Sequence, residues 1–385
     1  MSQDTYKIDG SKILNHPDRL MQWVNAHTID EKLKIDPIYL EIAPVGGCNH
    51  RCTFCAVDYL GYNAANILET QMLKERLTEM GQLGVRSVMY AGEGEPLLHK
   101  DLAEIIVHTR SIAGIDVAIT TNATPLTDRF ARVALPYTKW IKASINAGSR
   151  EEYSAIHKTS PEHFDRAWEN MANTVRIREQ LGLSPGEPAL GAQMVLLPDN
   201  ANTAIAFAKR AKDSGLDYAV IKPYSQHKKS NTKVYEGLKY DDYMTMEQEL
   251  EALNDGRFHV TFRSSAMDRL KSSHAERYKV CPSTPFMWGY IMATGDVYGC
   301  SAYLLDERFN YGNINKESFA KIWEGEKRKK AIDFVENELD ITECRQNCRM
   351  ASVNIDMVAL KAAQDPERML AEVNAKGIPS HVNFI

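Results

Sequence analysis

The sequence predicts an α/β protein built on a parallel sheet, and two observations support this fold class. From residue 37 onward, apolar runs typical of buried strands alternate with amphipathic stretches of helical spacing. Three of the strands also follow a glycine, at Gly84, Gly114 and Gly215, as expected where glycine ends a helix in the left-handed conformation. Units of this kind form either an open sheet or a barrel, and the pattern alone does not decide between them.

The strands are expected near residues 38–44, 87–92, 116–122, 140–146, 190–197 and 218–224. Between them, apolar residues recur at helical spacing and are expected to pack in the core; they are Leu73, Leu77 and Met80 in one helix, and Phe164, Trp168, Met171 and Val175 in another. Residues 1–36 are polar with scattered apolar positions, so we expect a short helical extension there.

Composition limits the class of protein and its partners. The chain has 385 residues, 44% of them hydrophobic, which is enough for one large domain and a smaller one. Its formal net charge of −5 is mild and mixed, so neither nucleic acid nor a membrane surface is expected as a partner. No apolar run approaches the roughly 20 residues that span a bilayer, and Met1–Asp4 do not open a signal peptide. We therefore expect a cytoplasmic protein.

The most informative stretch is Cys48-Asn49-His50-Arg51-Cys52-Thr53-Phe54-Cys55, directly after the first predicted strand. Three thiolates at this spacing can hold three irons of a [4Fe–4S] cluster and leave the fourth iron open for a small molecule. The alternative is structural zinc, which takes thiolates at similar spacings but needs a fourth ligand. His50 lies between the first two cysteines, where serving as that ligand would strain the loop.

At these residues the chain resembles the radical S-adenosylmethionine (SAM) superfamily, whose signature has this spacing and an aromatic residue, here Phe54, before the last cysteine. The resemblance implies a partial (β/α)6 TIM-like barrel in which Cys48, Cys52 and Cys55 hold the cluster. It implies that the open iron binds SAM and that one electron releases a 5′-deoxyadenosyl radical. An external flavodoxin or ferredoxin would supply that electron.

The resemblance also assigns SAM contacts, because barrel residues at the carboxyl ends of strands form active sites. Gly92-Glu93-Gly94-Glu95-Pro96 looks like the family's Gly-Gly-Glu segment, which binds the amino group of SAM. The resemblance implies that Gly94 and Glu95 bind SAM, with Glu95 in place of the family glutamate, although Glu93 stands where the first glycine is usual. The other contacts implied by position are Asn122 and Ser144 at the ends of the third and fourth strands, Arg150, Gln193, Leu197 and Phe54. Turn and cap chemistry is the alternative role for the polar members.

Residues for the substrate are expected after the sixth strand and in the extended segment near residues 258–263. Lys222, Tyr224 and Arg263 are our candidates for catalytic residues that hold a polar small-molecule substrate or act as a base. Solvated surface groups or structural ion pairs are the alternative.

The remaining four cysteines, Cys281, Cys300, Cys344 and Cys348, lie in the C-terminal quarter. A hairpin turning near Gly295-Asp296 is expected to deliver Cys300 to the others. Four thiolates suit either a tetrahedral zinc or a fully ligated [4Fe–4S] cluster. The spacing from Cys281 through Gly295 to Cys300 resembles the SPASM/twitch extension of radical SAM enzymes, which implies a second, auxiliary [4Fe–4S] cluster of the shorter, twitch type.

These assignments predict four regions: an N-terminal extension over 1–36, the barrel over 37–265, the SPASM/twitch domain over 275–350, and a C-terminal helix and tail over 351–385. The layout is similar to that of one-cluster alcohol dehydrogenases of aminoglycoside biosynthesis. That similarity implies an oxidoreductase that dehydrogenates a carbohydrate, cyclitol or sugar-nucleotide alcohol. The alternatives are a peptide-modifying maturase, a redox-neutral epimerase or lyase, and a non-catalytic metal scaffold.

Overall fold

The computed structural model describes residues 6, 8, 11–272, 276–345 and 347–385. Over this range the chain forms one curved ten-stranded sheet in the order β10-β9-β8-β1-β2-β3-β4-β5-β6-β7. The strands are β1 Tyr39–Ile42, β2 Ser87–Tyr90, β3 Asp116–Thr121, β4 Trp140–Ser144, β5 Ala189–Leu196, β6 Tyr218–Pro223, β7 His259–Phe262, β8 Trp288–Ile291, β9 Asp296–Tyr298 and β10 Asn310–Asn313.

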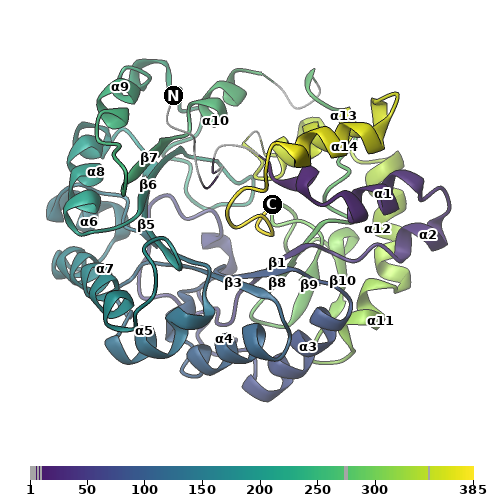
Figure 1. Cartoon of the computed structure of the whole chain (residues 1–385), viewed down its shortest axis with the longest axis horizontal. Helices are drawn as coiled ribbons and strands as arrows, with labels where there is room; N and C mark the ends of the chain where they lie inside the picture. The colour runs from purple at the N-terminus through teal and green to yellow at the C-terminus, as the bar shows by residue number, and fades with distance from the viewer. Residues whose placement is uncertain (1–5, 7, 9–10, 273–275, 346) are drawn as a thin grey trace.

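Helices line the outer side of the curved sheet, so the fold is a partial barrel of α/β type (Figure 1). The helices are α1 Pro17–Asn25, α2 Ile29–Leu33, α3 Thr70–Gln82, α4 Leu102–Ser111, α5 Asp128–Ala134, α6 Arg150–His157, α7 Glu162–Gln180, α8 Ala204–Asp213, α9 Met246–Glu251, α10 Ser264–Asp268, α11 Phe319–Trp323, α12 Glu326–Asn337, α13 Ala351–Ala362 and α14 Pro366–Ala375. The first purple helices and the last yellow ones lie side by side in Figure 1, and α1 contacts α14.

The six strands expected from the sequence are all present, and β1 to β7 pair in parallel in chain order. Gly84, Gly114 and Gly215 have φ values of 90°, 71° and 75°, so each occupies the left-handed region where side chains are strained. The apolar stripes expected on α3 and α7 are buried in the core. Met1–Asp4, which the signal-peptide expectation concerned, lie outside the described residues.

Successive side chains of the strands alternate between the helices and the barrel interior. On β1, Leu40 and Ile42 join the apolar core beneath the helices, whereas Tyr39 and Glu41 line the interior cavity. The same period of two on β4 places Ile141 under the helices and Lys142 inside. Consequently the outer layer is apolar while the inner layer carries polar and charged groups.

The sheet continues beyond the barrel into the C-terminal region, because β8 pairs in parallel with β1. The hairpin expected near Gly295 is β8–β9, and it is antiparallel as predicted. A Cβ on Gly289 would lie 2.9 Å from the side chain of Leu40, so glycine permits the close approach of the two strands. The C-terminal hairpin is therefore fixed to the first barrel strand.

The C-terminal tail covers the end of the barrel where the strands begin, and it ends in the middle of the view in Figure 1. Phe384 packs against Tyr39 and Trp140, with ring centroids 5.9 and 5.3 Å apart. The side chain of Asn383 donates to Asp116 over 2.7 Å. The tail thereby packs against the starts of β1, β3 and β4.

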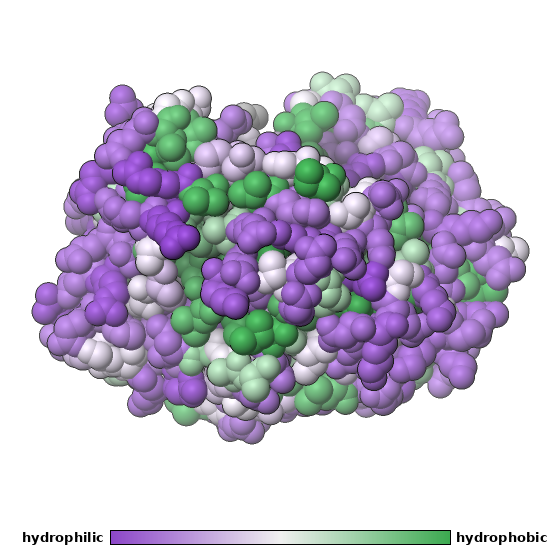
Figure 2. Space-filling model, turned by 90° about the horizontal axis from the view of Figure 1, so that it is seen from below, coloured by the Kyte–Doolittle hydropathy of each residue, from purple (hydrophilic) through white to green (hydrophobic). Residues whose placement is uncertain are grey.

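One face of the molecule is mainly hydrophilic, with hydrophobic side chains gathered in small groups (Figure 2). Among the described residues, no helix is both long and apolar enough to cross a membrane.

Arg328 provides a test of how the C-terminal region is held to the barrel. Its fully buried guanidinium donates to the carbonyls of Pro285, Leu33, Trp323, Lys32 and Ile35. Arg328→Met leaves these carbonyls unpaired, so we expect the free energy of unfolding to fall by on the order of 3 kcal/mol. Urea denaturation would measure this. The matched variant Lys330→Met, at an exposed position of the same helix, should be within about 0.5 kcal/mol of wild type; equal stability of both variants would contradict the assignment.

Candidate active site

The three cysteines of the first motif meet in the loop after β1. The loop is held against the end of α6, since the Thr53 amide donates to the Ile156 carbonyl over 2.8 Å and the Arg51 amide to the His157 carbonyl over 3.0 Å. Burial, together with the neighbouring Glu95 and Cys55, raises the pKa of Cys48 to about 12. The pKa of Cys52 is raised by burial and by the charges of Cys55 and Cys48. The three thiols therefore lie in one site, where their thiolate forms would repel one another unless a positively charged metal centre bound them.

A second set of donors overlaps this site. A ring nitrogen of His50, the sulfur of Cys52 and a ring nitrogen of His157 lie within 4.8 Å of one another. However, His157 Nε2 lies 2.7 Å from the Ile145 carbonyl, to which it must donate, and Nδ1 lies 3.2 Å from Cys52 Sγ as an acceptor. His50 is engaged by His163 over 3.0 Å. The donor set that fits an iron–sulfur cluster is therefore the three thiols, with His157 as a neighbour of Cys52.

The Gly92–Pro96 segment follows β2 and docks on the cysteine loop. A Cβ on Gly94 would lie 2.2 Å from the Val45 carbonyl oxygen and 2.4 Å from that of Gly47, so glycine is required. The two acids have different partners. Glu93 accepts from the Ala293 amide over 2.6 Å, which links the loop to the C-terminal hairpin.

Glu95, our candidate for the SAM amino group, is buried and accepts hydrogen bonds from its own chain. Its carboxylate accepts from Thr121 Oγ1 at 2.5 Å, from the Asn122 amide at 2.7 Å and from the Leu97 amide at 3.1 Å. Burial raises its pKa to about 7 against the opposing effect of these bonds. Glu95 therefore joins the ends of β2 and β3, and its role toward SAM stays a prediction.

The other predicted SAM contacts are spread around the carboxyl ends of the strands. Asn122 donates to Asn49 Oδ1 over 2.7 Å, so it braces the cysteine loop. Ser144 ends β4 and is half-buried. Arg150 lies on the surface at the start of α6 and pairs with Asp165 over 2.6 Å, away from the interior cavity.

The apolar candidates lie together. Phe54 packs against a cluster of buried residues that contains Leu197 and Tyr224. This cluster borders the cysteine loop, since Tyr235, another member, contacts Thr53 Oγ1 at 3.1 Å. The contacts of Phe54 and Leu197 with adenine stay a prediction.

A cavity of about 370 Å³ occupies the barrel interior and brings several predicted residues together. Gln193, Lys222 and Arg263 line it, whereas Tyr224 does not. The other lining residues used below are Glu41, Lys142, Arg345 and Arg349. Its walls are strongly basic, and a volume of this order suits a small-molecule ligand.

Lys142, Glu41 and Arg349 were missed by the sequence-based prediction. Lys142 and Glu41 stand in apolar strands at inward positions, and their alternation with apolar residues was the available signal. The sequence around Arg349 gave no such signal, because this residue belongs to the C-terminal region and lines the cavity only once that region packs on the barrel. It forms an ion pair with Glu41, and its guanidinium lies 5.3 Å from the centre of the Tyr39 ring.

The four C-terminal cysteines also converge, as the spacing predicted. All four line one small enclosed cavity, together with Tyr278 and Tyr303. Burial and the charges of Cys348, Cys281 and Cys344 raise the pKa of Cys300. All seven cysteines of the chain are free thiols, so both the first three and the last four are available as metal ligands. Four soft donors around an enclosed space fit a fully ligated cluster or zinc.

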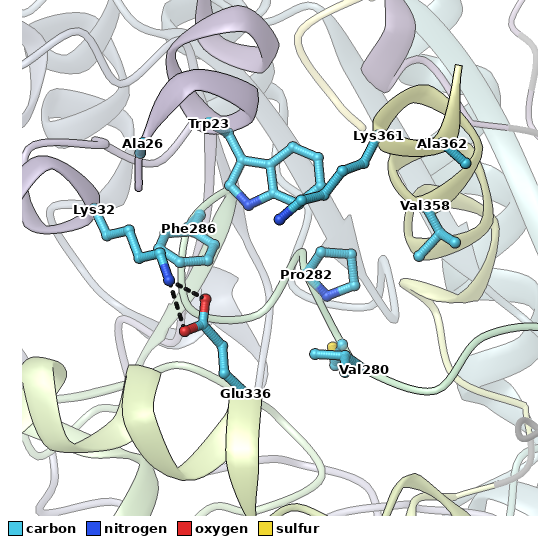
Figure 3. A pocket seen from close by; sticks show the side chains of 11 residues that line it. Trp23, Ala26, Lys32, Val280, Pro282, Phe286, Glu336, Val358, Lys361 and Ala362 are labelled. Atoms are coloured by element: carbon cyan, nitrogen blue, oxygen red, sulfur yellow. Dashed lines mark hydrogen bonds and ion pairs between the residues drawn. The ribbon is translucent and has the colours of Figure 1, made fainter. Parts of the chain in front are cut away.

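A further cavity lies on the outer side of this second centre, between α1, α12 and α13 (Figure 3). Trp23 and Phe286 face it, and an ion pair between Lys32 and Glu336, with its shorter contact at 2.7 Å, closes one side. Cys281 contributes to its lining. Among the described residues, those that line it include none from the Cys48–Cys55 loop.

Two family models match the chain. The radical SAM superfamily matches residues 42–185, and the iron–sulfur cluster-binding SPASM domain matches residues 254–349. The chain belongs to the radical SAM superfamily and carries a C-terminal SPASM domain. It is accordingly a radical SAM enzyme whose cofactors are [4Fe–4S] clusters and SAM.

Curated relatives resemble part of the chain. The GTP 3′,8-cyclase of Stenotrophomonas maltophilia (strain K279a) is 31% identical over 165 residues, which cover 41% of this chain and 46% of that protein. The GTP 3′,8-cyclase of Chlorobaculum tepidum is 26% identical over 195 residues, covering 49% and 55% respectively. The chain thus spans about half the length of the curated relatives it matches.

Solved structures share the fold over most of the chain. Streptococcus suis SuiB bound to precursor peptide SuiA has a TM-score of 0.63 at 16% identity, covering 92% of this chain and 78% of that one. The anSMEcpe structure with bound AdoMet has a TM-score of 0.55 at 17% identity, covering 83% and 88%. At these identities the likeness establishes the partial barrel with its C-terminal cluster domain, and nothing finer.

The lowered pKa of Lys142 predicts how a substitution there changes protein stability. Burial and the nearby Arg263 lower its pKa to about 8 from the ordinary 10.5, so the folded protein disfavours its charged form. Lys142→Met should therefore raise the free energy of unfolding at pH 7 by about 1–2 kcal/mol, less than the full pKa shift implies because the side chain is partly exposed. Between pH 8 and 10.5 the unfolded chain binds more protons at Lys142 than the folded protein does, so the free energy of unfolding of wild type rises with pH. The difference in stability between Lys142→Met and wild type should therefore shrink over this range.

Chemical denaturation of both proteins at pH 7, 9 and about 10.5 would test this relation. Lys209→Met, at an exposed position of α8, is the control and should show no such pH dependence. A Lys142→Met protein less stable than wild type at pH 7 would contradict the prediction.

Proposed function

We propose that this enzyme dehydrogenates an alcohol of a carbohydrate, cyclitol or sugar nucleotide bound in the barrel interior. The proposal is carried by one observation: Lys222, with a strongly lowered pKa, faces a polar cavity whose wall also includes Arg345, the residue next to Cys344 of the second centre. A base and a route for an electron are the two requirements of alcohol oxidation once a hydrogen atom has left carbon.

In this proposal Cys48, Cys52 and Cys55 hold the SAM-binding cluster, and Cys281, Cys300, Cys344 and Cys348 hold the auxiliary one. When bound, the first cluster and SAM supply a radical that removes a hydrogen atom from carbon, and the auxiliary cluster supplies an acceptor for one electron. Gly94, Glu95 and the polar strand ends orient SAM. Phe54 and Leu197 contact its adenine.

The chain's own contribution to the oxidation is a proton acceptor. Burial and the charges of Lys142, Arg263 and Arg345 lower the pKa of Lys222, so a neutral amine is available near neutral pH. It takes the hydroxyl proton as the carbonyl forms. Arg263 binds polar groups of the substrate. Tyr224 packs beside Phe54 and supports the SAM side rather than the substrate.

Two alternatives have specific support. The GTP 3′,8-cyclases that match part of this chain act, by name, on a nucleotide, which favours a nucleotide-bearing substrate and a redox-neutral outcome. SuiB was solved with a precursor peptide, which favours a peptide-modifying maturase. The three possibilities differ in substrate and in the oxidation state of the product. A flavodoxin or ferredoxin is proposed as the electron donor in each case.

The test is turnover by the anaerobically reconstituted enzyme with SAM and dithionite. Sugar nucleotides, cyclitols, GTP and a peptide library would be offered, and 5′-deoxyadenosine and product masses measured. We expect one oxidised product, lighter by two hydrogens, for each 5′-deoxyadenosine. Lys222→Met should lower turnover about 100-fold, as loss of a general base does, while Lys209→Met should match wild type.

A product of unchanged mass formed from GTP or a sugar nucleotide would overturn the dehydrogenase proposal in favour of a redox-neutral one. Consumption of peptides alone would favour the maturase. Absence of 5′-deoxyadenosine under every condition would contradict the radical chemistry itself.

A further inference from the structure

Polar side chains of the C-terminal region surround the sulfur of Cys281, one of the four cysteines of the second centre. Asn354 Nδ2 lies 3.3 Å from this sulfur and Thr284 Oγ1 lies 3.2 Å from it. The hydroxyl of Ser283 is 3.8 Å away. All four residues are buried, so these contacts form out of reach of solvent.

The backbone holds Asn354 in one orientation. This residue lies near the start of α13, which begins just after Cys348, and it is 1% exposed. Its Oδ1 accepts a hydrogen bond from the Ser283 amide over 3.0 Å. Because the oxygen is engaged in this way, the NH2 group is the end of the side chain that donates toward the Cys281 sulfur.

A buried amide donor is an unfavourable neighbour for a neutral thiol. The sulfur of a thiol is a weak acceptor, and a buried N–H group without a good acceptor costs free energy. The other buried residues of α13 include Val353, Met357 and Leu360, so an apolar side chain would suit this helix. A metal-bound thiolate is negatively charged and makes a charge-assisted hydrogen bond with the same N–H group. The position of Asn354 therefore fits a thiolate at Cys281.

Thr284 supplies a second donor from a different segment, the loop between Cys281 and β8. The hydrogen of a hydroxyl group rotates to suit its neighbour. Thr284 can thus accept a hydrogen bond from a thiol at Cys281, and it can donate one to a thiolate there over the same 3.2 Å. Two side-chain donors from separate segments consequently meet one sulfur.

We propose that Asn354 and Thr284 are positioning residues that raise the reduction potential of the second iron–sulfur centre through their hydrogen bonds to the Cys281 sulfur. An added electron places more negative charge on a cluster and its sulfurs, and N–H and O–H groups aimed at a sulfur stabilise that charge. These two side chains therefore favour the reduced state.

The inference goes beyond the proposed function, because it holds for any reaction in which the second centre takes up an electron. In the proposed alcohol oxidation, the two hydrogen bonds make this centre a better acceptor for the electron that leaves the substrate, while Lys222 takes the proton.

Redox titration of the anaerobically reconstituted full chain, followed by electron paramagnetic resonance, would test the inference. Every protein compared would carry alanine in place of Cys48, Cys52 and Cys55, so that the second centre alone is titrated. Asn354→Leu has a similar volume and no donor. It should lower the equilibrium constant for one-electron reduction about tenfold, which corresponds to about 59 mV.

Thr284→Val removes the hydroxyl and keeps the shape of the side chain, so it should lower the same equilibrium constant about threefold. Asn202→Leu, at an exposed position before α8, is the matched control and should leave the potential unchanged.

Iron content shows whether each variant retains the cluster, and Thr284→Val decides the test if Asn354→Leu loses it. The inference is overturned if the iron-loaded variant keeps the potential of the parent protein, if both variants lose the cluster, or if the second centre of the parent holds zinc. The turnover assay separates the two proposals. An oxidised product with unchanged potentials defeats this inference alone, and lowered potentials without an oxidised product defeat the proposed function alone.

Discussion

The pairing of β8 with β1 is the constraint on which the remaining structure depends. It joins the C-terminal hairpin to the first strand of the barrel over four residue pairs, from Tyr39–Trp288 to Ile42–Ile291. The cysteine loop leaves one end of β1, and Cys300 follows β9, the partner of β8. One continuous sheet therefore fixes both groups of thiols relative to the interior cavity. The bond from the Ala293 amide to Glu93 reinforces this junction from the side of β2.

The same junction explains why the cavity is basic. Arg345, next to Cys344, and Arg349, next to Cys348, line the same space as residues of the barrel strands. Arg349 neutralises Glu41, while Arg345 adds to the charge around Lys222. Arg345 thus lines both the proposed substrate site and the cavity of the proposed auxiliary centre, so we expect a substitution at one site to affect the other.

Much of this arrangement could be predicted from the sequence. The alternation of strands and helices, the glycine at each helix end and both groups of cysteines are local signals, and the structure contains them all. Interior residues were harder to recognise. Lys142 and Glu41 gave only a weak period-two signal inside short apolar strands, and Arg349 gave none, since its place depends on the contact between β8 and β1. Arg150 pairs with Asp165 at the surface, and its expected contact with SAM stays a prediction.

The assignment of two separate iron–sulfur centres is the central claim, and metal content tests it most directly. Iron and sulfide would be counted per chain after anaerobic reconstitution, for wild type and for variants with Cys48, Cys52 and Cys55, or all four C-terminal cysteines, replaced by alanine. The account predicts about eight irons in wild type and about four in each variant, with SAM cleavage lost in the first. About four irons and one zinc in wild type would contradict it, because the C-terminal centre could then accept no electron.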